Sequence, residues 1–342
     1  MAHSLNTARA GTEGQEESAA LGDAEPPSTG AAEPELLAVV VGALKAWGHA
    51  LDHSDDCALL TSATPHHIIT TDALCEGVHF DLAWDTLAQV GAQAAVANLS
   101  DLAASGGAPR ALVWSLSLPP TLRLDQLEAL TSGFARAAAQ WESPVVGGNL
   151  CVRPGPLELH VTALGAVTRR LHRRGAQPGD AVFVTGPLGA RALGYLEPSE
   201  ATRALRHEWR PHLQESAALS AWGRVSAMMD ISDGLLLDAR RLAEASGVSI
   251  ELEGALLPVC ARMSALASSP AVALQAALSG GEDYVLLFTA PAPPPPEARA
   301  IRVGACARAG AAGPQVTLDG LPVTPCGYQH ALTPSLSHPR HP

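Results

Sequence analysis

The amino-acid sequence predicts a two-domain fold of the α/β or α+β class. Its 342 residues match the length of two typical domains. With 47% hydrophobic and 16% charged residues, the chain has enough apolar side chains for packed cores. Short strand-like runs alternate with longer stretches of helical spacing, as in mixed folds. We expect an N-terminal domain over residues 34–168 and a C-terminal domain over residues 169–330, between polar tails at residues 1–33 and 331–342.

Each expected element follows from a local pattern. Pro34 opens a helix that continues to residue 50. Apolar and β-branched runs predict further strands at residues 67–71, 111–118, 157–167, 181–185, 225–231, 248–252, 284–289 and 300–305. Apolar residues at helical spacing predict helices at residues 82–105, 123–141, 190–196, 214–222, 234–246 and 263–278. The proline run at residues 290–296 is expected to be a surface linker, because proline lacks the N–H that helices and sheets require.

Charge and hydropathy exclude two classes of partner. The formal net charge of −12 argues against nucleic acid, which is bound by neutralising phosphates with lysine and arginine. The longest apolar run, residues 36–44, is too short for a membrane-spanning helix. Residues 1–30 lack the apolar segment of a signal peptide. We therefore expect a cytoplasmic protein that binds no membrane.

Several catalytic classes are also excluded. The single lysine, Lys45, lies outside any P-loop motif, so neither a P-loop enzyme nor a lysine Schiff-base enzyme is expected. The six cysteines form no C-x-x-C pair and are expected to be reduced. No histidine spacing is typical of a zinc enzyme.

Five short segments place acidic or small polar residues beside apolar runs, although aspartate is a poor strand former. They are residues 54–58, 70–72, 98–101, 230–234 and 279–283. The segment from Asp230 has two interpretations. Asp230 or Ser232 could cap the following helix, which Gly247 would end. Two carboxylates flanking a serine at such a junction also suit magnesium and phosphate.

The other acidic positions are equally open. Asn98, Asp101 and Ser105 could form a solvated polar stripe on a helix. Asp72 is expected at a strand end, where ligands of α/β sheets gather, or in a simple turn. The aspartate pair at residues 55–56 could lie in an exposed turn or bind a cation, because adjacent like charges repel.

Seven segments between residues 35 and 328 carry a family pattern. They read D-D-C-A-L from Asp55, T-T-D-A-L-C-E-G-V-H-F from Thr70, N-L-S-D-L-A-A from Asn98, G-G from Gly147, G-D-A-V-F-V-T-G from Gly179, D-I-S-D-G-L from Asp230 and S-G-G-E-D-Y from Ser279. In this order they resemble the thiamine-monophosphate kinase family of the aminoimidazole ribonucleotide synthetase-like superfamily. The resemblance implies a two-domain fold whose N-terminal α/β domains pair in a homodimer. It also implies magnesium-dependent transfer of a phosphoryl group from ATP to thiamine monophosphate, giving thiamine diphosphate.

The resemblance assigns roles to individual residues. Magnesium would be held by Asp56, Thr70, Thr71, Asp72, Asp101, Asp230 and Asp233. ATP would contact Gly148, Asn149, Arg173 and Ser232, and thiamine monophosphate would contact His79, Glu282 and Tyr328. Several cations are needed because so many carboxylates would otherwise repel two anionic substrates. No general base is expected, since the acceptor phosphate is mostly dianionic at neutral pH.

The sequence departs from the family pattern at Asn149, where the pattern has aspartate. An amide oxygen can ligate magnesium but brings no negative charge, so we expect one metal to bind more weakly. Two alternatives therefore stay open. One is another ATP-using synthetase of the same superfamily, and the other is a non-catalytic nucleotide-binding homologue.

Overall fold

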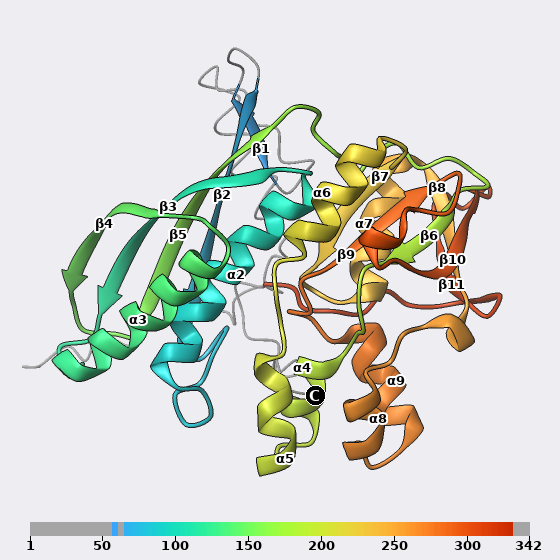
Figure 1. The fold of residues 1–342 in the computed structure, drawn as a ribbon. Coiled ribbons are helices and arrows are strands. Elements are labelled where there is room, and N and C mark those ends of the chain that lie inside the picture. Colours follow the sequence, from blue (N-terminus) through green and yellow to red (C-terminus); the bar gives the residue numbers. More distant parts are fainter. Residues whose placement is uncertain (1–56, 61–64, 331–342) are drawn as a thin grey trace, which may run out of the picture.

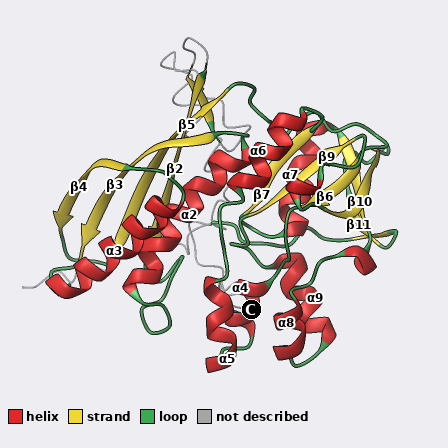
Figure 2. Ribbon diagram, viewed as in Figure 1, coloured by secondary structure: helices red, strands yellow, loops and turns green. Residues whose placement is uncertain are grey.

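The computed structural model describes residues 57–60 and 65–330. Within them the chain forms two β-sheets, each with its own helices (Figures 1 and 2). The first sheet takes its strands from residues 58–167 and the second from residues 181–322, so the predicted boundary lies in the connection between them. The predicted helix at residues 34–50 and the predicted metal ligand Asp56 lie outside the described residues.

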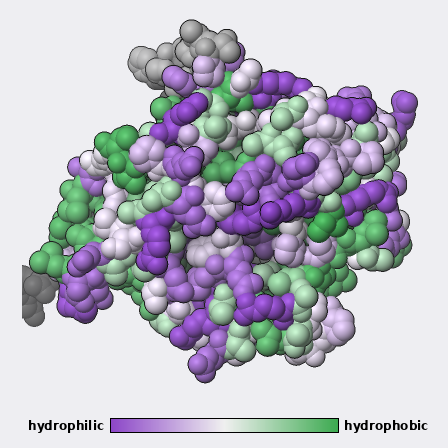
Figure 3. Space-filling view, viewed as in Figure 1, coloured by the Kyte–Doolittle hydropathy of each residue, from purple (hydrophilic) through white to green (hydrophobic). Residues whose placement is uncertain are grey.

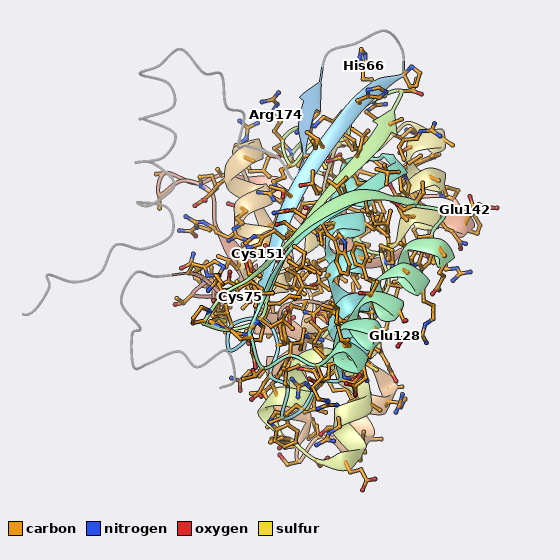
Figure 4. All side chains as sticks on the ribbon, turned by 90° about the vertical axis from the view of Figure 1, so that its left-hand side faces the viewer. His66, Cys75, Glu128, Glu142, Cys151 and Arg174 are labelled. Atoms are coloured by element: carbon orange, nitrogen blue, oxygen red, sulfur yellow. The ribbon has the colours of Figure 1, made fainter. Side chains whose placement is uncertain are left out.

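The first sheet is a five-stranded layer with helices packed on one face. Its strands, in spatial order, are β1 (Ala58–Leu60), β2 (His66–Cys75), β5 (Glu158–Val167), β3 (Ala108–Leu118) and β4 (Val145–Val152). Only β3 and β4 are parallel. The helices α2 (Leu87–Ala104) and α3 (Leu124–Gln140) cover one face (Figure 1). Figure 4 turns this sheet toward the viewer, and its labels Cys75 and Cys151 lie on one row of paired residues across the strands.

The second sheet has seven strands. In spatial order they are β12 (Leu321–Pro322), β11 (Val316–Leu318), β8 (Val248–Leu252), β10 (Ile301–Arg308), β6 (Ala181–Val184), β9 (Val285–Ala290) and β7 (Ala227–Ile231). Its helices are α4 (Ala190–Leu196), α5 (Glu200–Arg203), α6 (Leu213–Trp222), α7 (Leu235–Ser246), α8 (Ala261–Leu266) and α9 (Pro270–Ser279). Short 3-10 turns lie at Ala204–His207, Gly254–Leu256 and Pro296–Ala298.

The predicted fold class is confirmed, with local corrections. The helix predicted from residue 82 begins at Leu87, because Thr86 forms a capping box with Gln89. The helix predicted over residues 263–278 is two helices, since Ser269 caps a new helix that starts at Pro270. The strands β1, β4, β11 and β12 and the short helix α5 were not predicted. The proline run does connect β9 to β10, as expected.

The two domains pack through the last turn of α2. Ala103 and Ala104 belong to a buried cluster that also contains Leu219 of α6 and Phe288 of β9. The Ser216 hydroxyl on α6 donates to the Ala103 carbonyl oxygen over 2.6 Å. The C-terminal half of α2 therefore stands between the two sheets.

No helix in the described ranges is long and apolar enough to cross a membrane.

Two glycines set the close approach of α2 and α3. A Cβ at Gly91 would overlap the carbonyl oxygen of Leu130, and a Cβ at Gly133 would overlap the carbonyl oxygen of Ala88. Both obstacles are backbone atoms of the facing helix, which cannot rotate away. The pair of helices can move apart only by opening the core beneath them.

We predict that Gly133→Ala lowers the free energy of unfolding by about 1–3 kcal/mol or more, because the added methyl overpacks a helix–helix contact. Denaturant titration would measure the change. Gly310→Ala is the matched control, since no atom lies within 4 Å of its added Cβ. Equal stability of the two variants would contradict the close-packed interface.

Candidate active site

The first part of the candidate site joins β2 to α2. The Thr70 hydroxyl donates to Asp101 Oδ2 over 2.6 Å. Asp72 lies two residues after Thr70 and therefore on the same face of the strand. It lies inside β2 and not at a strand end, because β2 pairs with β5 over all ten of its residues. Thr71 faces the other side, where its hydroxyl bonds Thr162 Oγ1 over 3.0 Å.

The second part joins α2 to β7 of the other domain. The Ser100 hydroxyl donates to Asp230 Oδ2 over 2.6 Å, and the Asp230 residue is 2% exposed. The expected solvated stripe on this helix is wrong, since Asn98 and Ser105 are buried by the packed domains. Asp101 and Asp230 are thus brought together through the adjacent residues of α2.

The turn after Asp230 is held by a residue that follows it. Asp238 Oδ2 accepts from the backbone N–H groups of Asp233 and Gly234 over 3.0 and 3.1 Å. Helix α7 is therefore not capped by the side chain of Asp230 or Ser232, while Gly247 ends it in a left-handed conformation as predicted.

The charges at this turn are closely coupled. Arg241 Nη1 donates to both Asp233 Oδ2 and Asp238 Oδ1, over 2.5 and 2.8 Å. Burial first, and then the charge of Asp233, raise the pKa of Asp238 to about 7 against the opposing effect of Arg241. One arginine thus serves two carboxylates, and further positive charge would be stabilised beside them.

The segment at residues 279–284 lies directly on this turn. The Glu282 N–H donates to the Ser232 carbonyl over 2.7 Å. A Cβ at Gly281 would overlap that same carbonyl, so only glycine allows so close an approach. Asp283 accepts from the Gly189 N–H, and burial raises its pKa to about 8.

The three predicted thiamine-site residues gather near this segment. The Glu282 carboxylate accepts from Arg191 Nε over 2.5 Å, and the same guanidinium reaches the carbonyl of His79 over 3.3 Å. Tyr328 N–H donates to the Asp233 carbonyl over 3.0 Å, and its hydroxyl bonds His330 Nδ1 over 3.1 Å. The rings of His79 and His330 lie 5.9 Å apart.

Two of the predicted ATP-contacting residues lie apart from this cluster. Gly148 and Asn149 are on β4, and the paired row that contains Thr71 reaches β4 only after β5 and β3. Three strand spacings separate them, which is about 14 Å. Arg173 follows His172, whose carbonyl accepts from the Met228 N–H over 2.7 Å, so its backbone lies beside the strand that carries Asp230.

The side chains of the cluster fit a hard cation. Thr70, Asp72, Asp101, Asp230 and Asp233 offer only oxygen, which magnesium prefers, whereas the hydroxyl of the predicted ligand Thr71 lies on the other face of β2. Within the described ranges, no three His, Cys, Asp or Glu side chains enclose a metal position by themselves. Magnesium commonly keeps waters and uses one or two carboxylates together with substrate phosphates, so an open arrangement suits it. Its assignment to these residues stays a prediction.

Several residues that shape the site were not predicted. They are Ser100, Gln93, Arg191, Asp238, Arg241 and His330. Ser100 lies inside a quoted motif, so its neighbours could have drawn attention to it. Arg191 and Gln93 lie on helices without any local signal, and only the packing of the domains places them here.

We predict that Ser100→Ala lowers the free energy of unfolding by about 1–3 kcal/mol, because it removes a hydrogen bond from a buried carboxylate. Thermal and denaturant unfolding would measure this. Ser105→Ala is the control on the same helix, since that buried hydroxyl has no hydrogen-bond partner among the described residues. A Ser100→Ala protein as stable as the control would contradict the role given to this bond.

Comparison with known proteins places the chain in a family. The model for AIR synthase related protein, N-terminal domain, matches residues 54–167, and that for the C-terminal domain matches residues 177–305. Thiamine-monophosphate kinase of Aquifex aeolicus is 34% identical over 81% of this chain and 92% of its own length. That of Mycobacterium tuberculosis (strain H37Rv) is 35% identical over 71% of this chain and 76% of its own.

A solved structure gives the same result. AaThiL complexed with AMPPCP and TMP matches with a TM-score of 0.77 and 31% identity, covering 87% of this chain and 97% of that chain. The fold, the two domain matches and these identities agree along most of the sequence. The chain therefore belongs to the AIR synthase related family and, within it, to the thiamine-monophosphate kinases.

Proposed function

We propose that this chain transfers the γ-phosphoryl group of ATP to thiamine monophosphate, producing thiamine diphosphate and ADP. The observation that carries the proposal is the meeting of β2, α2 and β7, which brings Asp72, Asp101 and Asp230 to one place beside the segment at residues 279–284. The choice of substrates is supported by the relatives named thiamine-monophosphate kinase and by the solved structure of AaThiL with AMPPCP and TMP.

The carboxylates would form the phosphate end of the site. Thr70, Asp72, Asp101, Asp230 and Asp233 would hold magnesium, which supplies the positive charge that screens the phosphates from the carboxylates and from each other. Hydrogen bonds from Thr70 and Ser100 fix two of these carboxylates, so little reorganisation is needed when the substrates bind.

The residues near Glu282 would form the thiamine end. Its carboxylate, His79 and Tyr328 come from three distant parts of the chain and lie around the turn that carries Asp233. A ligand that spans from this group to the carboxylates would present its phosphate to ATP. An oxygen of that phosphate attacks the γ-phosphorus and ADP leaves, with no proton to remove from the nucleophile.

We also propose that the chain works as a homodimer through β4. All eight residues of this edge strand are exposed, and Val146, Leu150 and Val152 are 65%, 49% and 61% exposed. Hydrophobic surface is visible in Figure 3 over the edge of the molecule where Figure 1 shows β4. A bare apolar edge strand favours pairing with another chain.

The dimer would explain the position of Asn149. Within one chain it lies about three strand spacings from Thr71, although both side chains face the side of the sheet opposite α2 and α3. Closing β4 against the first strands of a second copy would bring Asn149 to the partner's β2. Each ATP site would then use residues from both copies.

We predict that the purified protein converts thiamine monophosphate to thiamine diphosphate with ATP and magnesium, and that EDTA abolishes the reaction. Asp72→Asn should lower kcat/KM by about 100-fold or more, since it removes a charge at the phosphates. Product chromatography is the measurement. The control is Asp125→Asn, an exposed carboxylate on α3. ATP binding without turnover would favour the non-catalytic homologue, and turnover with a purine precursor or selenide would favour the synthetase alternative.

A second prediction tests the shared site. Asp72→Asn and Asn149→Lys proteins should each be inactive, but mixed dimers formed from the two should regain roughly a quarter of wild-type activity. Half of the dimers would be mixed, and one of their two sites would hold both native residues. No recovery after dissociation and reassociation of a mixture that does form mixed dimers would show that Asn149 serves its own chain.

A further inference from the structure

Arg191 is a buried cation to which the proposed reaction gives no role. It lies on α4 and is 2% exposed. Its Nε donates to Glu282 Oε2 and its Nη1 to the Arg206 carbonyl, each over 2.5 Å. Its Nη2 donates to the Tyr195 hydroxyl over 2.9 Å and to the His79 carbonyl over 3.3 Å. Every nitrogen of the guanidinium is therefore engaged.

These contacts connect the two halves of the thiamine end. His79 follows β2 of the N-terminal domain, and Glu282 precedes β9 of the C-terminal domain. A single planar group reaches both, and its fork of donors fixes their relative position. Lysine could keep the charge of Arg191 but not the fork.

The Glu282 carboxylate depends on such support. Its backbone has φ of 63°, which a non-glycine residue rarely adopts, and it lies outside any helix or strand. Gln93 Nε2 on α2 donates to Oε1 over 2.8 Å, while Arg191 holds Oε2. Each oxygen of a carboxylate has a second lone pair, so the held group can still accept hydrogen bonds from a ligand.

We infer that Arg191 is a positioning residue for thiamine monophosphate, with Gln93 as its counterpart from the other domain. The inference rests on the proposed function and adds to it the groups that set affinity for the acceptor substrate. The hydrogen bonds of Arg191 reach neither Asp72 nor Asp230, so its effect should fall on thiamine monophosphate and not on ATP.

The test measures KM for each substrate separately, together with calorimetric binding of thiamine monophosphate. Arg191→Met should raise KM for thiamine monophosphate about 10-fold or more and leave KM for ATP within about twofold, because a charged hydrogen bond to Glu282 is lost. Arg191→Lys should recover part of the affinity. Gln93→Leu should show the same selectivity with a smaller rise, and it carries the test if Arg191→Met fails to fold.

A double-mutant cycle separates positioning from general damage. In a Glu282→Gln background, Arg191→Met should change KM for thiamine monophosphate by less than about twofold, because its effect acts through the carboxylate. Arg210→Met is the matched control. It removes the partner of the fully buried Glu215 in the same domain and should not alter either KM selectively.

Two failures are distinguishable. A wild-type protein that makes no thiamine diphosphate defeats the proposed function itself. If the wild type is active, three results would overturn the inference. They are an unchanged KM for thiamine monophosphate in Arg191→Met, an equal rise in both KM values, and a full effect of Arg191→Met in the Glu282→Gln background.

Discussion

The hydrogen bond between Ser100 and Asp230 is the constraint on which the arrangement of the site depends. A carboxylate that is 2% exposed is costly unless it is hydrogen-bonded, and here its partner comes from the other domain. Helix α2 must therefore dock against β7. Because Asp101 follows Ser100 on that helix, the same docking places the Thr70–Asp101 pair beside Asp230. The contact that packs the two domains together is thus also the contact that sets the geometry of the site.

The two ends of the site differ in their balance of charge. At the carboxylate end one cation, Arg241, serves both Asp233 and Asp238, so negative charge is in excess. At the other end the buried Arg191 balances Glu282. The first end is suited to cations that accompany phosphates, and the second to a neutral set of hydrogen bonds. A ligand that has a phosphate at one end and hydrogen-bonding groups at the other would be oriented by this difference.

Local sequence could predict much of the fold because strands such as β5 and helices such as α3 carry clear periodicity. It missed β4, whose Val-Val-Gly-Gly-Asn start has two glycines and apolar residues that no described element covers. It placed Asp72 at a strand end because a polar triplet ordinarily ends a strand. The roles inferred for Gln93 and Arg191 depend on their contacts with Glu282, which lies 189 and 91 residues away along the chain. No local sequence pattern encodes contacts over such separations.

The position of Tyr328 extends this argument to the whole chain. Its N–H bonds the Asp233 carbonyl, and its hydroxyl reaches His330, whose ring lies near that of His79. The thiamine end is thus closed by the last described residues against a segment near the start of the first domain. Neither domain alone contains the site, because Ser100 and His79 of the first domain bond Asp230 and Arg191 of the second. The site residues therefore come from segments that are far apart in the sequence, and the ordered set of these segments identifies them together.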